Sequence, residues 1–265
     1  ASTVTVSSGS LGAGTFTVTY DLSGANSATS NTATLTMGGA GTGTFTIPGT
    51  ALASTGSTTV TVAQVTNANG CNSSLSSGNT SVFDVYPYPD AYTVTGTGGF
   101  CTGSAGLHVI LSNSDGGISY QLYRDGTPTG AAVAGTFAAL DMGAQTTGGT
   151  YTVIGTNTTT LCAANMTGSA VLTENPLPTA YAVTGGGAYC SGGSGVTIGM
   201  ANSDHDVNYQ LYLAGVATGS AVAGTGSAIS FGYQTGAGTY TVVATNSITS
   251  CTNNMTGSAI VTVNP

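Results

Sequence analysis

The sequence predicts an all-β protein made of three small β-sandwiches in tandem. An internal repeat is the first reason: residues 92–176 and 181–265 align without a gap, and more than half of the aligned residues are identical. A period of about 90 residues is too long for a solenoid turn and fits one small sandwich. Composition is the second reason, since threonine, valine and tyrosine favour strands, while the abundant glycine, serine and asparagine favour turns.

Proline-rich junctions divide the chain into three parts. Similar segments containing proline close each part, at 86–89, at 175–178 and at 264–265. Such segments are typical of short, stiff linkers. We therefore predict domains at residues 1–88, 89–178 and 179–265.

Strict alternation predicts the strands of the first domain. Threonine occupies the outward positions in repeated Thr-Phe-Thr and Thr-Val-Thr patterns. The expected strands are Thr3–Val6, Thr15–Tyr20, Thr32–Met37, Thr42–Ile47, Thr58–Val65 and Ser81–Tyr86.

The second repeat contains seven short segments with strand character. They are Tyr92–Thr95, Leu107–Leu111, Ile118–Tyr123, Ala131–Ala134, Phe137–Leu140, Thr150–Thr156 and Ala170–Thr173. Asp125-Gly126 is a hairpin-turn signal. Strands this short, with turns every 8–12 residues, indicate an immunoglobulin-like sandwich. Tyr151 and Tyr240 follow glycine-rich turns, and we interpret them as corner tyrosines that bond back to the backbone, or as ordinary core aromatics.

Four of the five cysteines form two regular pairs. Cys101 and Cys162, and Cys190 and Cys251, have the same spacing in their repeats. Regular pairs in repeated small domains predict disulfides Cys101–Cys162 and Cys190–Cys251, and with them an oxidising, extracellular setting. Zinc is the rival interpretation, but the chain has neither CxxC spacing nor paired histidines.

The fifth cysteine, Cys71, has no partner in the first domain. Aligning it with Cys162 places Ser10 where Cys101 would lie, so the first domain is predicted to lack its leading cysteine. Cys71 is then either an unpaired thiol or one half of a bridge between molecules.

The charge pattern excludes several partners. Only 4% of residues are charged, the formal net charge is −8, and Arg124 is the only strong base. Such a chain cannot neutralise a row of phosphates, which excludes nucleic acid and polybasic binding to a membrane surface. No apolar run approaches the roughly 20 residues of a membrane span, so we expect no membrane insertion.

The sequence offers little for catalysis or metal binding. His108 and His205 are not repeated, because their counterparts are Thr197 and Gly116. We therefore predict no catalytic site, no cofactor and no enzyme activity. Asp204 and Asp206 form a weak calcium candidate, for which a solvated turn is the alternative.

The third repeat resembles a known family. The stretches that carry the resemblance are YAVTGGGAYCSGG at 181–193, NYQLY at 208–212, GTYTVVATN at 238–246 and CTNNMTGS at 251–258. Together they are similar to the Ig-like repeats of very large secreted surface proteins of Bacteroidetes, including gliding-type adhesins and fibre-forming arrays. The resemblance covers 92–265 closely and 1–91 loosely.

This resemblance implies disulfide-tied sandwiches, export across two membranes and an adhesive or structural role. The chain departs from the family pattern at the missing leading cysteine. No C-terminal secretion domain follows Pro265 either, from which we expect a piece of a longer array or a processed subunit.

We expect a non-enzymatic structural protein at the cell surface. It would be a subunit of a self-assembling filament whose partner is copies of itself, or the stalk of an adhesin that binds a surface ligand. Low charge and threonine-lined edges without charged protection favour pairing between copies. The alternative is a carbohydrate-binding accessory module, for which the candidate exposed aromatics are Tyr86, Tyr88, Tyr189 and Tyr233.

Overall fold

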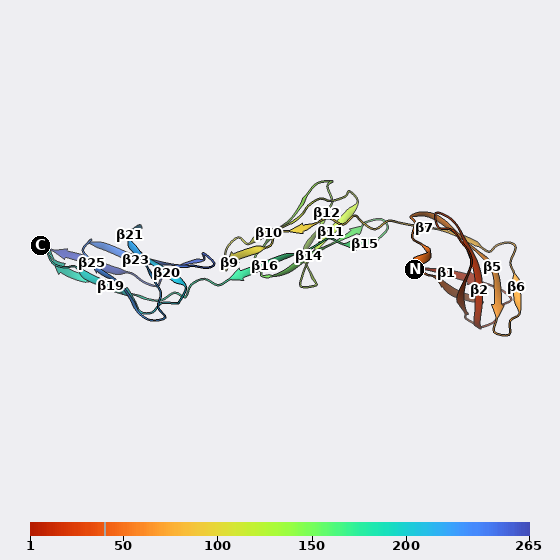
Figure 1. Cartoon of the computed structure of the whole chain (residues 1–265), viewed down its shortest axis with the longest axis horizontal. Helices are drawn as coiled ribbons and strands as arrows, with labels where there is room; N and C mark the ends of the chain where they lie inside the picture. The colour runs from red at the N-terminus through yellow and green to blue at the C-terminus, as the bar shows by residue number, and fades with distance from the viewer. Residues whose placement is uncertain (40) are drawn as a thin grey trace. The chain divides into compact units, whose positions relative to one another are not determined.

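A computed structural model describes residues 1–39 and 41–265, and the described residues form strands, turns and one short 3₁₀ segment, Gly49–Ala51 (Figure 1). The chain divides into two compact units. One comprises Ala1–Pro89 with Thr159–Cys162, and the other comprises Asp90–Thr158 with Ala163–Pro265. Each predicted domain range contains a hydrophobic core of its own. The domain boundaries themselves stay a prediction.

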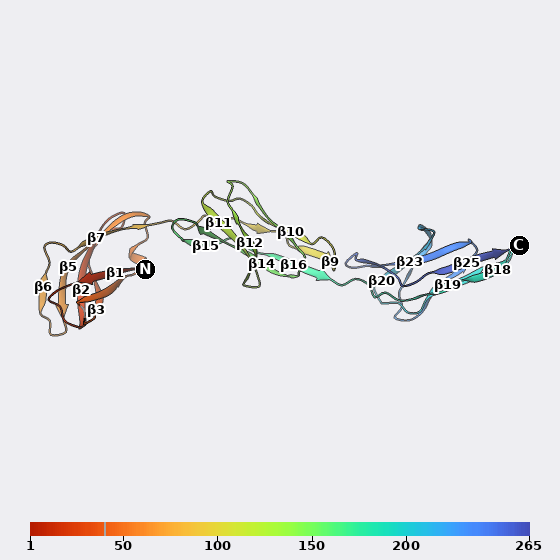
Figure 2. The ribbon, with the colours of Figure 1, turned by 180° about the vertical axis from the view of Figure 1, so that it is seen from behind.

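The first domain is one continuous sheet. Its strands are β1 (Ser2–Ser7), β2 (Gly14–Gly24), β3 (Ala28–Met37), β4 (Thr42–Ile47), β5 (Gly56–Asn67), β6 (Asn72–Ser74) and β7 (Thr80–Val85). They pair in the order β1-β4-β3-β2-β5-β6, with β7 also on β5, and Figure 2 shows β6, β5, β2 and β3 side by side. The predicted alternation puts Val18, Phe45 and Val60 in the core and threonine outside.

The second repeat is a two-sheet immunoglobulin-like sandwich. Its strands are β8 (Val94–Thr95), β9 (Gly98–Cys101), β10 (Leu107–Leu111), β11 (Ile118–Arg124), β12 (Thr127–Ala134), β13 (Leu140–Gln145), β14 (Gly149–Asn157), β15 (Ala163–Asn165) and β16 (Ala170–Asn175). One sheet has the order β13-β10-β8 and the other β12-β11-β14-β16-β9, with β15 on β14. Tyr120 and Tyr151 are the largest fully buried side chains between them.

The third repeat has the same sandwich. Its strands are β17 (Val183–Gly185), β18 (Gly187–Cys190), β19 (Val196–Met200), β20 (Val207–Leu213), β21 (Val216–Ala223), β22 (Ile229–Gln234), β23 (Gly238–Asn246), β24 (Thr252–Asn254) and β25 (Ala259–Asn264). The sheet orders are β17-β19-β22 and β18-β25-β23-β20-β21. All-β tandem sandwiches are therefore the fold of this chain, as predicted.

In both repeats the leading segment crosses from one sheet to the other at glycine. β8 pairs antiparallel with β10, and β9 then pairs parallel with β16. Gly96, between them, has φ +123°, and a Cβ there would collide with the carbonyl oxygen of His108. Gly185, the last residue of β17, has φ +88°, and a Cβ there would collide with the carbonyl oxygen of Thr197. These glycine-rich stretches therefore serve a strand crossing that only glycine permits.

The structure confirms the corner tyrosines. The Tyr151 hydroxyl donates to the carbonyl oxygen of Thr147 at 2.8 Å, and Tyr240 donates to that of Gly236 at 2.9 Å. The hairpin turn at Asp125-Gly126 is also confirmed, since both residues have positive φ between β11 and β12.

Two predictions from the sequence are wrong. The expected strand Phe137–Leu140 is a turn, because Phe137 has φ +61° and is exposed, and β13 begins only at Leu140. Ser10 is not the counterpart of Cys101. It follows β1, and β1 is the counterpart of β10, a strand that Cys101 precedes. Among the described residues of the first domain, no strand corresponds to β8 or β9.

Candidate functional site

The most distinctive chemical feature is a disulfide that joins the second repeat to the third. Cys101, at the end of β9, is bonded to Cys251, in the turn between β23 and β24, with Cα atoms 5.5 Å apart. The Cys251 Sγ also lies 4.0 Å from the carbonyl oxygen of Asn175, the residue beside Cys101 on β16. Asn253 donates from its amide nitrogen to the carbonyl oxygen of Pro178 at 2.8 Å. The leading strand β9 of the second repeat is thus covalently fixed to the turn between β23 and β24 of the third repeat.

This bond corrects the predicted pairings Cys101–Cys162 and Cys190–Cys251. Cys101 lies level with Asn175 at one end of the sandwich, whereas Cys162 follows Asn157, at the far end of β14. The eight residue steps of β14 separate those ends by about 25 Å, at about 3.3 Å per residue. A disulfide requires Cα atoms within about 7 Å. The equal spacing correctly indicated that the cysteines have a repeated structural role. The two cysteines that bond, however, belong to neighbouring repeats.

Three thiols are free in the structure. Cys71 and Cys190 are exposed, and Cys162 is half-buried. Cys190 ends β18 opposite Asn264, just as Cys101 ends β9 opposite Asn175. Cys190 therefore occupies a position equivalent to that of Cys101 in the bonded pair.

The turn cysteines are equivalent to one another in the same way. The Asn67 backbone N–H donates to the carbonyl oxygen of Cys71 at 2.9 Å, and the Asn246 N–H donates to that of Cys251 at 2.9 Å. Cys71 lies between β5 and β6, as Cys251 lies between β23 and β24. The first domain thus has the cysteine that corresponds to Cys251, but it lacks the leading strand and the cysteine that corresponds to Cys101.

A Tyr-Asp-Tyr cluster recurs in both repeats. The Tyr92 hydroxyl donates to Asp115 Oδ1 at 2.5 Å, and the Asp115 N–H donates to the Tyr120 hydroxyl at 2.9 Å. In the third repeat, Asp204 makes the same contacts with Tyr181 at 2.6 Å and Tyr209 at 2.8 Å. The bond to Asp115 raises the pKa of Tyr92 to about 12. This cluster locks the leading segment onto the sandwich.

The same contacts occupy the carboxylate of the weak calcium candidate. Burial alone would raise the pKa of Asp204, but hydrogen bonds from Tyr181 and Thr179 outweigh it and lower that pKa. Asp206 has φ +61° in the turn, where its carbonyl oxygen accepts from Ser247. Within residues 1–39 and 41–265, no group of three potential metal-ligating side chains comes together. Asp204 thus accepts hydrogen bonds from the leading segment, and Asp206 lies in the turn before β20.

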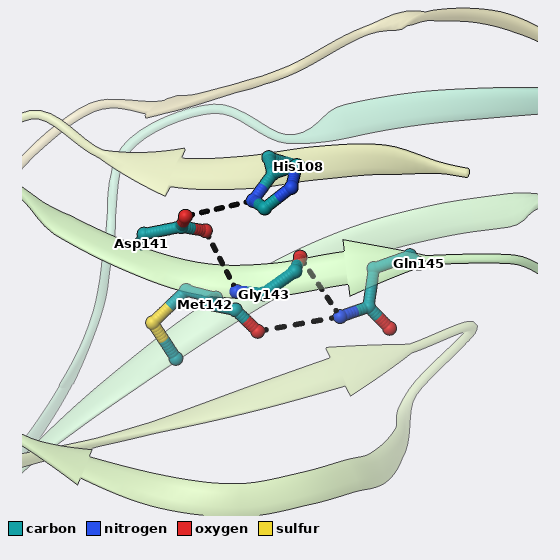
Figure 3. Close-up of polar contacts among 5 residues, drawn as sticks. All are labelled: His108, Asp141, Met142, Gly143 and Gln145. Carbon is teal, nitrogen blue, oxygen red and sulfur yellow. Dashed lines mark hydrogen bonds and ion pairs between the residues drawn. The ribbon is translucent and has the colours of Figure 1, made fainter. Parts of the chain in front are cut away.

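His108 and Asp141 form the one side-chain pair in the second repeat that resembles part of a catalytic triad. Figure 3 shows His108 Nδ1 beside Asp141 Oδ2 at 2.7 Å, while Asp141 Oδ1 accepts from the Gly143 N–H at 2.8 Å. The Gln145 side-chain amide donates to the carbonyl oxygens of Met142 and Gly143 in the same strand, β13. Both members of the pair are more than half exposed, at 56% and 51%. The pair lies on exposed strands, where a contact between two solvated side chains contributes little to stability.

The tyrosines proposed for carbohydrate stacking differ in exposure. Tyr86, Tyr88 and Tyr233 are exposed. Tyr189 is half-buried on the core of the third repeat, and its hydroxyl donates to the carbonyl oxygen of Thr235. Tyr86 and Tyr88 are separated by Pro87 in the segment that follows β7.

Comparisons with known proteins show only distant likeness. No protein-family model and no curated protein matches the chain. A 1.5-MDa bacterial ice-binding adhesin is similar at 15% identity and TM-score 0.34, over 99% of this chain and 91% of that one. The FN1-FN3 domains of chicken CNTN1 are similar at 12% identity and TM-score 0.30, over 98% and 94%. Murine CEACAM1b is similar at 12% identity and TM-score 0.34, over 65% and 99%. At these values the likenesses carry no argument about function.

The described residues contain no helix with the length and hydropathy needed to cross a bilayer.

Proposed function

We propose that this chain is a non-enzymatic structural protein of the cell surface, a subunit of a filament or stalk in which Ig-like repeats are joined head to tail by disulfides. The single observation that carries the proposal is the Cys101–Cys251 bond. It links the leading strand of one repeat to a turn of the next. Such a covalent bond would carry tension from one repeat to its neighbour in an array. A disulfide also implies an oxidising compartment outside the cytosol.

In the Cys101–Cys251 bond, a leading-strand cysteine of one repeat pairs with a turn cysteine of the next. The free thiols allow the same pairing between two molecules. Cys190 is a leading-strand cysteine and Cys71 is a turn cysteine, and both are exposed. The rule that joins Cys101 to Cys251 therefore pairs Cys190 of one copy with Cys71 of the next. Cys162 is the turn cysteine whose leading-strand partner the first domain does not supply.

The surface chemistry favours close contact between copies. Only 4% of residues are charged, so few like charges oppose each other when two copies meet. In the first domain, the outward positions of β4 and β5 are mostly threonine, which is polar but lacks the charge that usually blocks pairing between strand edges.

Oxidation of the purified protein tests this function. Two thiols and one oxidised glutathione give the new disulfide and two reduced glutathione molecules, so electrons and protons balance. We expect a ladder of covalent oligomers on a non-reducing gel, lost in both Cys71→Ser and Cys190→Ser and retained in Cys162→Ser. A ladder that persists in Cys71→Ser, or that disappears in Cys162→Ser, contradicts the proposal.

Tyr86 and Tyr88 favour a second candidate, a carbohydrate-binding accessory module, because exposed aromatic rings can stack on sugars. A glycan array distinguishes the two functions. Binding that is lost in the Tyr86→Ala, Tyr88→Ala double variant supports the module, and an array without hits removes it.

A further inference from the structure

The first domain has two strands with an open edge, β1 and β7, whose counterparts in the other two domains have a neighbour on both sides. β10 pairs with β13 on one side and β8 on the other, and β16 pairs with β14 and β9. Their counterparts in the first domain have one neighbour each within the described residues: β1 pairs with β4, and β7 pairs with β5. Both open edges face the place that the leading strand fills in the repeats.

Side-chain burial shows the same deficit. Val109 and Leu111 of β10 are fully buried, whereas Val4 and Val6 of β1 are only half-buried. On the last strand, the fully buried Ala170 lies opposite Tyr151, and its counterpart Ser81 lies opposite Val60. Ser81 is exposed although it points to the side of the sheet that carries the core. The core of this domain is therefore incompletely covered between the open edges of β1 and β7.

A cavity of about 370 Å³ lies between these two edges. Val60, Val62 and Val65 form its floor, and Val4, Val6 and Leu11 are the apolar residues along its β1 side. Leu75 and several serine, threonine, asparagine and glycine residues complete the lining, and no charged side chain contributes to it. An occupant must therefore be uncharged and must bring apolar side chains inward.

The other two domains show what such an occupant looks like. In the second repeat, Val94 and Phe100 of the leading segment are buried in the core, and Tyr92 packs against it. In the third repeat, Tyr181, Val183 and Tyr189 take those positions. The segment runs antiparallel to β10 and then parallel to β16, so one extended strand completes both sheets.

We propose that the cavity between β1 and β7 is a strand-acceptor site for an extended β-segment from a second molecule. The segment runs antiparallel to β1 and parallel to β7. It is uncharged, about ten residues long, and carries aromatic or branched side chains at the positions of Tyr92, Val94 and Phe100. Adding a strand to an open edge combines backbone hydrogen bonds with side-chain pockets. This binding needs no thiol, so its test is independent of the proposed disulfide chemistry.

A peptide with the sequence of residues 92–101, carrying serine in place of Cys101, is the probe. Fluorescence anisotropy of the labelled peptide is measured against the full-length chain under reducing conditions. We expect saturable binding of one peptide per chain, and at least a tenfold loss when threonine replaces the valine and phenylalanine of the peptide. Equal binding of the two peptides, or no saturable binding, overturns the proposal.

Two neighbouring residues of β7 give matched protein variants. Ser81 lines the cavity, whereas Val82 is 63% exposed and does not line it. Ser81→Trp fills the site, so we expect at least tenfold weaker peptide binding with the fold retained. Val82→Thr leaves the site open and should bind as the parent chain does. Binding that survives Ser81→Trp in a folded protein places the peptide elsewhere and contradicts this site.

Discussion

The first domain and the second repeat place equivalent strands around cores of different completeness. β10 has neighbours on both sides, and its Val109 and Leu111 are fully buried, whereas β1 has one neighbour and half-buried valines. The second repeat carries its own leading strand and ends it with Cys101, which reaches into the next repeat. This difference shows that the leading segment both completes the core of its repeat and supplies the cysteine that bonds to the next repeat. A domain without this strand lacks both.

Truncating equivalent inward residues should affect the two domains most unequally. Leu111→Ala removes a fully buried side chain from an enclosed core and should cost about 3 kcal/mol of the local free energy of unfolding. Val6→Ala removes a half-buried one and should cost about 1 kcal/mol. Hydrogen exchange read by mass spectrometry reports each domain separately. Equal losses in the two domains would contradict the difference in core completeness.

Blocking the strand crossing should be the next largest effect. Gly185 has φ +88°, and a Cβ would meet the carbonyl oxygen of Thr197. Gly185→Ala should therefore destabilise the third repeat by about 2 kcal/mol. Faster exchange in residues 183–190 measures it. Gly12→Ala is the matched control, because a Cβ there meets nothing within 4 Å, and exchange should not change.

Removing a corner hydroxyl should have a smaller effect. Tyr240→Phe loses the hydrogen bond to the carbonyl oxygen of Gly236 while keeping the buried ring. We expect about 1 kcal/mol lower stability of the third repeat, seen as a lower denaturant midpoint for that repeat. Tyr86→Phe, at an exposed position, serves as the control. A Tyr240→Phe variant as stable as the parent would show that the corner is ordinary core packing.

The pH response of the Tyr-Asp-Tyr cluster should be the smallest effect. The folded-state pKa of Asp204 is lowered, so its ionised form stabilises the fold above the unfolded-state pKa. That contribution is lost as pH falls through the folded-state pKa. Asp204→Asn should therefore flatten the acid limb of the stability curve of the third repeat. An unchanged acid limb would mean that the bonds from Tyr181 and Thr179 do not favour the ionised form.

The sequence predicted much of the fold because the strands alternate strictly. Ile118–Arg124 and Gly149–Asn157 were visible from their inward tyrosines, leucine and valines, and the corner tyrosines from the glycines before them. The parallel strand Gly98–Cys101 was missed, since its two glycines give no alternation. Its only signal was the cysteine at its end.

The site was predictable in its residues and not in its pairing. Repetition of Cys101 and Cys162 in the third repeat marked the four cysteines, but spacing along a chain does not say at which end of a sandwich each lies. That information comes from strand direction: β9 ends at the end of the sandwich where β14 begins. The same missing strand placement led to Ser10 being aligned with Cys101.

Disulfide mapping of the native protein tests the head-to-tail junction most directly. With one basic residue in the chain, trypsin is unsuitable, so non-reduced protein is digested with pepsin and read by mass spectrometry. The account predicts a linked peptide pair containing Cys101 and Cys251. Linked pairs containing Cys101 with Cys162 and Cys190 with Cys251 would contradict it, because each repeat would then be closed on itself.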